Sequence, residues 1–122
     1  MSLTGFDHVN IRTTQRDATL RFWRDVLGLA EGPRPGLNFQ GAWLYCGDLP
    51  VIHLNFSSEN EDADRTGAID HVAFRVADRA SILRTLQEND VSLFGQQTDE
   101  SGNLRRALVR DPNGITVELL FQ

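Results

Sequence analysis

The chain has 122 residues, of which 40% are hydrophobic and 24% are charged, and its formal net charge is −5. These values are typical of one globular domain with a single core. The acidic balance excludes a sequence-independent nucleic-acid binder, because such a protein needs a basic stripe. All 12 basic residues are arginine, which also excludes a Schiff-base lysine and a P-loop lysine.

The cysteine content and the hydropathy bear on the cellular compartment. Cys46 is the only cysteine, so the chain has no internal disulfide and a reducing compartment is expected. It lies in the apolar run 42–46, where a small residue is expected to be buried. No apolar run approaches the roughly 20 residues that span a bilayer, and no signal peptide is visible. The sequence therefore predicts a cytoplasmic protein without a membrane segment.

A short motif occurs twice in the chain, 63 positions apart. Residues 6–13 read FDHVNIRT, and residues 69–76 read IDHVAFRV. An aspartate, a histidine, a valine and an arginine coincide, so we interpret the chain as one supersecondary unit written twice. The sequence predicts a single domain of two modules, about 4–56 and 69–122, joined by a polar linker over 57–68.

Each copy of the motif has the alternation of a half-buried strand. In the second copy Val72, Phe74 and Val76 share one face, and His71 lies on the other. The same parity applies to His8 in the first copy. Both histidines are therefore predicted to point away from the apolar face that packs on a helix.

The first module continues with a helix, a loop and further strands. Thr14 and Asp17 have the spacing of a capping box, and Gly28 is placed to end the helix in a left-handed conformation. The segment 32–36 is rich in glycine and proline and is expected to be a loop. The helix has the apolar stripe Leu20, Trp23, Val26 and Leu27. Strands follow over about 37–46 and 50–56, and the first of these spans is either one strand or two strands with a break near Gly41.

The second module repeats this order. Asp78 is the expected N-cap of a helix whose apolar stripe contains Ile82, Leu83 and Leu86. The sequence DPNG at 111–114 has each residue where a type I turn favours it. The remaining predicted elements are strands near 91–96, 104–110 and 115–121 and a hairpin loop over 98–103.

The last strands of the two modules also correspond, at an offset of 65. VIHLNF at 51–56 lies over TVELLF at 116–121, so His53 and Glu118 are equivalent residues. Apolar residues alternate with both of them, which places their side chains on the opposite face. Four residues are thus predicted to lie mid-strand on the polar faces: His8, His53, His71 and Glu118.

This set has the composition of a site for a divalent metal. A carboxylate inside a sheet is costly unless a partner pairs with it, and imidazoles with a carboxylate suit divalent transition metals. Taken singly, each histidine is more often a hydrogen-bonded core or surface residue, and Glu118 is more often solvated. The joint pattern favours a metal site, because all three histidines of the chain occupy repeat-equivalent positions.

The paired modules, a histidine at the head of each and a carboxylate strand after the DPNG turn resemble the vicinal oxygen chelate superfamily. The resemblance extends from Phe6 to Phe121. That superfamily includes glyoxalase I, extradiol dioxygenases, methylmalonyl-CoA epimerase, fosfomycin-resistance enzymes and bleomycin-resistance proteins. The resemblance implies an α+β fold of two βαβββ modules whose curled mixed sheets form a cup around a metal. It also implies a homodimer in which both subunits contribute ligands.

The resemblance also implies a function and residue roles. The implied metal ligands are His8, His53, His71 and Glu118, and Glu118 and His53 have catalytic roles. The divalent metal binds two neighbouring oxygens of a small-molecule substrate and acts as a Lewis acid. The implied activity is that of a lyase or isomerase of the glyoxalase kind, or of a dioxygenase. The alternative is a non-catalytic small-molecule or antibiotic-binding protein of the bleomycin-resistance kind.

His53 distinguishes this chain from particular members of the superfamily. Glyoxalase I has a carboxylate or its like at this position, whereas His8, His71 and Glu118 resemble the facial triad of the extradiol dioxygenases. Those enzymes use an additional histidine as acid/base, and His53 alone is left for that role. His53 is therefore either a fourth ligand or an acid/base, and the metal is iron, nickel, zinc, cobalt or manganese.

Other residues are candidates for substrate contacts. Arg12 and Arg75 share the parity of the motif histidines, and they are either grips for an anionic substrate or surface ion-pair partners. Trp43, Tyr45 and Phe39 either wall an aromatic pocket or are plain packing residues. The substrate itself is not predicted, because the loops that set specificity in this architecture carry no signature.

Overall fold

The computed structural model describes residues 5–56, 69 and 71–122. The chain divides into two compact units, a first unit over 1–61 and a second unit over 62–122, and each is described by itself. The division falls between the two predicted modules. The predicted linker over 57–68 lies outside the described residues, and the prediction that both modules form a single domain stays a prediction.

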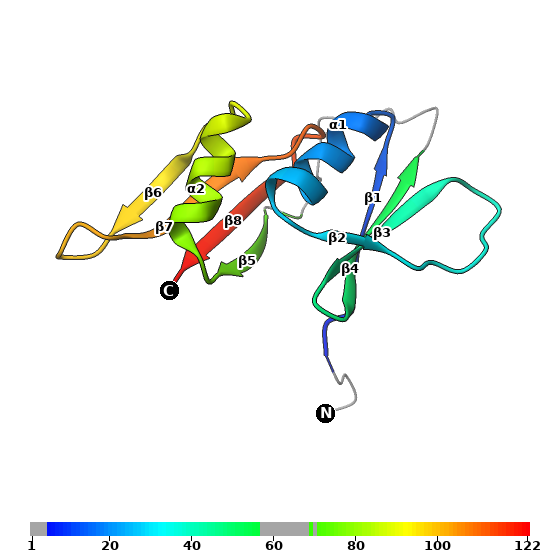
Figure 1. The fold of residues 1–122 in the computed structure, drawn as a ribbon, viewed down its shortest axis with the longest axis horizontal. Helices are drawn as coiled ribbons and strands as arrows, with labels where there is room; N and C mark the ends of the chain where they lie inside the picture. The colour runs from blue at the N-terminus through cyan, green and yellow to red at the C-terminus, as the bar shows by residue number, and fades with distance from the viewer. Residues whose placement is uncertain (1–4, 57–68, 70) are drawn as a thin grey trace. The chain divides into compact units, whose positions relative to one another are not determined.

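The first unit is one mixed sheet and one helical segment (Figure 1). Its strands lie in the order β1-β4-β3-β2, with β1 parallel to β4 and the other neighbours antiparallel. The elements are β1 (Val9–Thr13), α1 (Arg16–Leu20), η1 (Arg21–Val26), β2 (Ala30–Gly32), β3 (Gly41–Cys46) and β4 (Leu49–Phe56).

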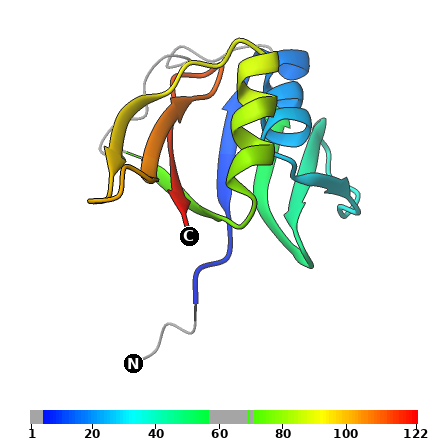
Figure 2. The same cartoon turned by 60° about the vertical axis from the view of Figure 1, so that its left-hand side comes forward.

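The second unit has the same topology, which Figure 2 shows from another side. Its strands lie in the order β5-β8-β7-β6, again with one parallel pair, β5 and β8. The elements are β5 (Val72–Val76), α2 (Arg79–Glu88), β6 (Phe94–Thr98), β7 (Leu104–Arg110) and β8 (Thr116–Phe121). The predicted α+β fold of two βαβββ modules with mixed sheets is confirmed.

The strand register of the two units is identical at the predicted equivalent positions. His53 pairs with Asn10 on β1, and Glu118 pairs with Ala73 on β5. On the other neighbouring strand, His53 pairs with Trp43 and Glu118 with Leu108. The sequence offsets of 63 and 65 therefore correspond to real structural equivalence.

Burial follows the predicted alternation along the strands. Ile52 and Leu54 are about 1% exposed, and Val117 and Leu119 are equally buried in the second unit. The residues between them lie on the opposite side of each sheet, because side chains alternate along a strand. We call this side the polar face of each unit: Asn10, Arg12, Trp43, His53 and Asn55 in the first, and Ala73, Arg75, Arg106, Leu108 and Glu118 in the second.

The helix of the first unit differs from its prediction at its start. The capping box of Thr14 and Asp17 is wrong: Gln15 is the N-cap, and no side chain caps the helix. Thr13 takes over part of the role, since its hydroxyl accepts a hydrogen bond from the backbone N–H of Gln15 at 2.9 Å. The predicted left-handed end is confirmed, with a φ of 86° at Gly28.

The second half of this helix is wound as a π-helix. The backbone N–H of Leu27 bonds to the carbonyl of Phe22, five residues back. This wider turn brings Phe22 to the buried side together with the predicted Trp23 and Val26. The 3.6-residue periodicity used for the prediction does not apply there, so Phe22 was not expected in the core.

Two local predictions in the second unit are confirmed. The carboxylate of Asp78 caps α2, accepting a hydrogen bond from the N–H of Ser81 at 3.0 Å. The DPNG turn closes with a bond from the N–H of Gly114 to the carbonyl of Asp111 at 3.1 Å. In addition, the Asp111 carboxylate accepts bonds from the N–H groups of Asn113 and Ile115, at 2.8 Å each.

Other predictions about strands and burial are wrong in detail. His8 and His71 lie immediately before β1 and β5, not mid-strand. The strand expected over 37–46 begins only at Gly41, and the short β2 strand was missed. Cys46 is exposed, because it lies at the β3–β4 turn. Among the helices in the described part of the chain, none has the length and apolar character to cross a membrane.

Candidate functional site

The four predicted site residues form two pairs, one in each unit. His8 and His53 are in contact in the first unit, and His71 and Glu118 are in contact in the second. Within the described residues, no group of three or more His, Cys, Asp or Glu side chains is close enough to hold a metal ion. The structure thus brings the predicted residues together two by two, and the set of four stays a prediction.

In the first unit, three aromatic rings form a stacked column on the polar face. The His53 ring lies 3.7 Å from that of His8 and 3.9 Å from that of Trp43, measured between centroids. The interplanar angles are 11° and 12°, so the three rings are almost parallel. The register explains this contact, because Trp43 and His53 are direct cross-strand partners.

The stacking limits what the two histidines can do together. The lone pair of an imidazole nitrogen lies in the plane of the ring, and a metal ligand directs it at the ion. Two planes that are 11° apart in direction do not meet near the rings. Therefore His8 and His53 do not direct lone pairs at one ion in this arrangement, and only one of them fits the same coordination shell.

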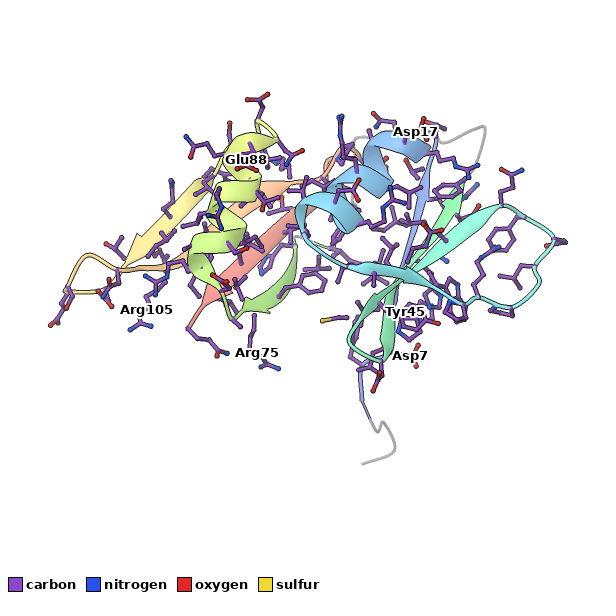
Figure 3. The ribbon with its side chains drawn as sticks, in the orientation of Figure 1. Asp7, Asp17, Tyr45, Arg75, Glu88 and Arg105 are labelled. Carbon is purple, nitrogen blue, oxygen red and sulfur yellow. The ribbon has the colours of Figure 1, made fainter. Side chains whose placement is uncertain are left out.

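His8 is oriented like a metal ligand. Its Nδ1 lies 2.7 Å from the Oδ1 of Asp7, which leaves Nε2 as the outward nitrogen. Asp7 is at the head of the first unit, where Figure 3 labels it. A carboxylate on the far nitrogen fixes the tautomer and the ring orientation of histidine ligands. The Asp7 carboxylate lies at the corresponding place on His8.

His53 is the buried ring of the column, with 9% of its surface exposed. Its Nε2 is buried and has no hydrogen-bond partner within the described residues. Burial lowers the pKa of His53 below 6.5, and His8 lowers it further, while a hydrogen bond with the Pro50 backbone acts in the opposite direction. A neutral ring with a protonated Nδ1 leaves Nε2 as an unsatisfied acceptor, which suits a ligand hydroxyl or a cation.

In the second unit, Glu118 is the centre of a three-residue cluster. Its side chain is 14% exposed, and its Oε2 accepts a hydrogen bond from Nε of Arg106 at 2.7 Å. Nε2 of His71 lies 3.7 Å from the same oxygen. Nη1 of Arg106 also donates to the carbonyl of Gly95 on β6, at 3.3 Å. The guanidinium is therefore anchored between β6 and the carboxylate of β8.

The pair of His71 and Glu118 fits a divalent metal. An ion about 2.1 Å from each donor can bridge a nitrogen and an oxygen up to about 4.2 Å apart. The observed separation of 3.7 Å is within this limit. The donor types, one imidazole and one carboxylate, are those that divalent transition metals accept.

Sequence reasoning missed Arg106. Its position contained the signal, because it lies two residues from Leu108, the cross-strand partner of Glu118. It therefore shares the polar face with Glu118, and an arginine is long enough to reach the carboxylate diagonally. Without strand pairing the choice among several arginines was open.

The other predicted substrate contacts have separate surroundings. Arg12 and Arg75 are exposed, and Figure 3 labels Arg75 near β5. The hydroxyl of Tyr45 donates to the Pro33 carbonyl. Phe39 lies under the guanidinium of Arg34, 5.2 Å from ring centroid to guanidinium carbon. Of the predicted aromatic wall, only Trp43 contacts a predicted site residue through its ring.

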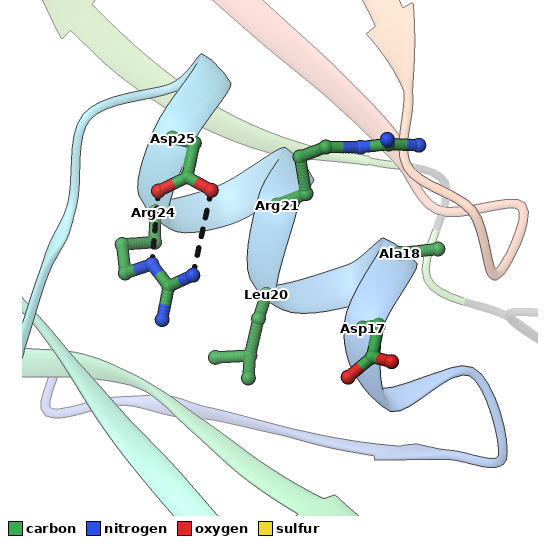
Figure 4. Close-up of a pocket in the computed structure, with 6 residues that line it drawn as sticks. All are labelled: Asp17, Ala18, Leu20, Arg21, Arg24 and Asp25. Atoms are coloured by element: carbon green, nitrogen blue, oxygen red, sulfur yellow. Dashed lines mark hydrogen bonds and ion pairs between the residues drawn. The ribbon is translucent and has the colours of Figure 1, made fainter.

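A pocket of about 520 Å³ lies on the helical segment of the first unit (Figure 4). Charged side chains dominate its lining, and Arg24 is bound to Asp25 and to Glu31. None of the four predicted site residues lines it. The lining residues are Asp17, Ala18, Leu20, Arg21, Arg24 and Asp25.

The profile of the Glyoxalase/Bleomycin resistance protein/Dioxygenase superfamily matches residues 5–119, almost the whole chain. The chain belongs to this superfamily. The resemblance inferred from the repeated motif and the carboxylate strand is thereby confirmed. A comparison with curated proteins gives no match.

Solved structures share the fold over at least 98% of this chain. A glyoxalase family protein of Bacillus anthracis has a TM-score of 0.74 and 22% identity, over 100% of this chain and 98% of that one. Glyoxalase I of Leishmania major has a TM-score of 0.71 and 24% identity, over 98% of this chain and 87% of that one. The antibiotic-binding protein TnmS3 of Streptomyces sp. CB03234 has a TM-score of 0.69 and 16% identity, over 99% of this chain and 98% of that one. At these identities the likeness concerns the fold, which enzymes and a binding protein share.

Proposed function

We propose that this chain is a metal-dependent enzyme acting on a small molecule, of the glyoxalase or dioxygenase type. The observation that carries the proposal is the 3.7 Å approach of His71 Nε2 to Glu118 Oε2 on the polar face. The equal strand register adds support, since it places the imidazole of His53 in the first unit at the position that Glu118 has in the second.

In this proposal His8, His71 and Glu118 hold a divalent ion, and His53 contacts the substrate. A bound ion of this kind acts as a Lewis acid on neighbouring substrate oxygens. Glu118 contributes the negative charge of the ligand set, and Asp7 keeps the outward nitrogen of His8 available. Because the rings are parallel, we assign His53 the acid/base role rather than that of a fourth ligand.

The chain's own residues supply the proton acceptor and its surroundings. Nε2 of His53 is buried without a partner in the described part of the chain, so a substrate hydroxyl that reaches it finds an unoccupied acceptor. Trp43 covers one side of the ring and His8 the other, which holds the imidazole in one orientation. A fixed ring is what general acid/base catalysis requires.

A second candidate is a binding protein without turnover. The column of Trp43, His53 and His8 presents aromatic faces at its two ends, on Trp43 and on His8, and planar ligands stack on such faces. TnmS3 gives this alternative a precedent within the fold. It differs from the first candidate in needing no metal for ligand binding.

The two candidates are separated by metal content and by reaction screens. Protein purified without added metal is analysed for iron, nickel, zinc, cobalt and manganese, and then tested after loading with each. Oxygen uptake with a panel of catechols tests the dioxygenase, and isomerisation of thiol adducts tests the glyoxalase type. About one ion per chain, together with turnover that chelation abolishes, supports the enzyme. Absence of metal binding with retained ligand binding supports the binding protein.

The proposal includes the assembly and compartment expected from the sequence. We propose a homodimer in which each site draws ligands from both subunits, and a cytoplasmic location. Light scattering on the purified protein measures the first, and fractionation of the source cells measures the second. A monomer with full metal binding would contradict the shared site.

A further inference from the structure

Arg34, in the loop between β2 and β3, has a half-buried guanidinium with few partners. Its Nη2 donates to the carbonyl of Phe39 at 2.9 Å, and its guanidinium carbon lies 5.2 Å from the centre of the Phe39 ring. Its Nε is buried without a hydrogen-bond partner, and no carboxylate in the described part of the chain pairs with this arginine. Buried polar groups are normally hydrogen-bonded, so the Nε of this partly buried arginine is an unsatisfied donor.

The internal repeat relates the place of the Arg34 guanidinium to that of Arg106 in the second unit. Gly41 pairs with Asn55, as Arg106 pairs with Leu120, so Gly41 is the equivalent of Arg106. A side chain at Gly41 would collide with the Leu54 carbonyl and would come within 3.1 Å of Nη2 of Arg34. The guanidinium of Arg34 thus lies beside the position from which Arg106 extends in the other unit.

The two guanidinium groups differ in their counter-charge. In the second unit Arg106 is paired with Glu118 at 2.7 Å. In the first unit the residue equivalent to Glu118 is His53, whose imidazole carries no negative charge. The first unit therefore holds a cation at the equivalent place without the carboxylate that neutralises it in the second.

The neighbourhood of Arg34 limits the shape of an anion that would bind there. Asn55 is the cross-strand partner of Gly41, and Trp43 is two residues further along β3, or roughly 7 Å. The carboxamide of Asn55 can donate to an anion, and the ring column begins at Trp43. A ligand that carries a carboxylate next to an aromatic ring matches this spacing.

We propose that Arg34 binds the carboxylate of an aromatic or similarly planar small molecule, whose ring stacks on Trp43 at the end of the column. The planar fork of a guanidinium pairs with a carboxylate through two parallel hydrogen bonds. Naming this molecule the substrate rests on the proposed function, whereas binding itself does not. The inference thus assigns the ligand to the class of aromatic carboxylates.

Benzoate and benzamide test the inference, because they have the same shape and differ in charge. Binding is followed by tryptophan fluorescence and by calorimetry, in the presence of EDTA. We expect benzoate to bind the wild-type protein at least about tenfold more tightly than benzamide. In Arg34→Gln the two affinities should agree within about twofold, and Arg34→Lys should retain part of the preference.

The control variant is Arg16→Gln. Arg16 is an exposed arginine of the same unit that donates to Gln40 and lies over the ring of Phe56, 4.9 Å from its centre. This variant should keep the full preference for benzoate. Equal binding of both probes to the wild type, an unchanged preference in Arg34→Gln, or no benzoate binding below about 10 mM would overturn the inference.

Repeating the titration with each metal separates this inference from the proposed function. A benzoate preference that depends on Arg34, in a protein that binds no metal, refutes the metal-dependent enzyme and supports the anion site. Metal binding by a protein that shows no benzoate preference refutes the anion site and supports the metal-dependent enzyme. Thermal unfolding of each variant reports folding, and Arg34→Lys keeps the test decisive where Arg34→Gln does not fold.

Discussion

Nε of Arg106 donates a hydrogen bond to Oε2 of Glu118 at 2.7 Å, and Nε2 of His71 lies 3.7 Å from the same oxygen. One carboxylate oxygen is thus shared by a permanent cation and a candidate metal ligand. A metal ion at that oxygen competes with the guanidinium. The ion pair also gives Glu118 a partner in the absence of metal, which a carboxylate with 14% exposure needs.

Removal of Arg106 should strengthen metal binding. In Arg106→Gln the competing charge is lost, and a unit charge about 5 Å from a divalent ion interacts with it by about 7 kcal/mol at an effective dielectric constant of about 20. Partial exposure and the loss of orientation reduce this effect, so we expect the dissociation constant to fall about tenfold, or about 1.4 kcal/mol. Calorimetric titration with zinc or nickel measures it.

The neighbouring Arg105 provides the control for this prediction. It pairs with Asp99 at 3.1 Å on the exposed hairpin, away from Glu118. Arg105→Gln should leave the metal affinity unchanged. Weaker binding in Arg106→Gln would mean that orientation of the carboxylate outweighs charge competition.

The stacked histidines should differ in their effect on metal binding. Because parallel rings allow only one of them in the shell, and Asp7 orients His8, we expect His8→Gln to weaken metal binding by more than about a hundredfold. His53→Gln should keep the affinity within about threefold and abolish turnover. The reverse pattern in the same titration would make His53 the ligand.

Stability in the metal-free protein should depend on pH through His53. Burial, and secondarily His8, lower its pKa below 6.5 in the folded state. The unfolded chain then binds the proton more readily, so this stability is present above about pH 6.5 and is lost as the pH falls toward the folded pKa. Urea unfolding with EDTA at pH 7.5 and at pH 5 measures the loss, at conditions on either side of the ordinary histidine pKa of about 6.5.

A variant at this position isolates the contribution. His53→Gln should lose less stability between the two pH values than the wild type, because the titrating group is gone. Equal curves for His53→Gln and the wild type would contradict the assignment.

Asp111 should be a strong contributor to stability. Asp111 is 4% exposed, and its carboxylate accepts hydrogen bonds from the backbone N–H groups of Asn113 and Ile115. Loss of an acceptor from buried donors costs about 1–3 kcal/mol, so we expect Asp111→Ala to lower the free energy of unfolding by about 3 kcal/mol. Denaturant titration measures the change.

The chain contains a matched control for this turn. Oδ1 of Asp99 accepts bonds from the N–H groups of Ser101 and Asn103 in the same pattern, but its side chain is 27% exposed. Water can replace the lost acceptor there, so Asp99→Ala should cost about 1 kcal/mol. Similar losses in both variants would show that burial is not the cause of the difference.

The repeat made most of the fold predictable. Alternation over β4 and β8 predicted the faces of His53 and Glu118 correctly, because burial on one side enforces a period of two. The equivalence of His53 with Glu118 was also correct, since both are paired in the same register. The turn at Asp111 followed from local chemistry alone.

Features that depend on long-range contacts were not predictable. The π-helical winding that buries Phe22 breaks the regular helical period. The short β2 strand pairs with β3 through only three residues and has no periodicity of its own. The parallel stacking of His8 on His53 and the anchoring of Arg106 on Glu118 depend on side-chain conformations, which the sequence pattern does not contain.

We propose that one metal site draws on both repeats. Cobalt titration of the metal-free protein tests this, with the visible ligand-field absorption recorded in the wild type, in His8→Gln and in Glu118→Gln. We expect about one cobalt ion per chain in the wild type and loss of the same absorption band in either variant. A band that persists in both variants, or that depends on the residue of one repeat alone, would contradict it.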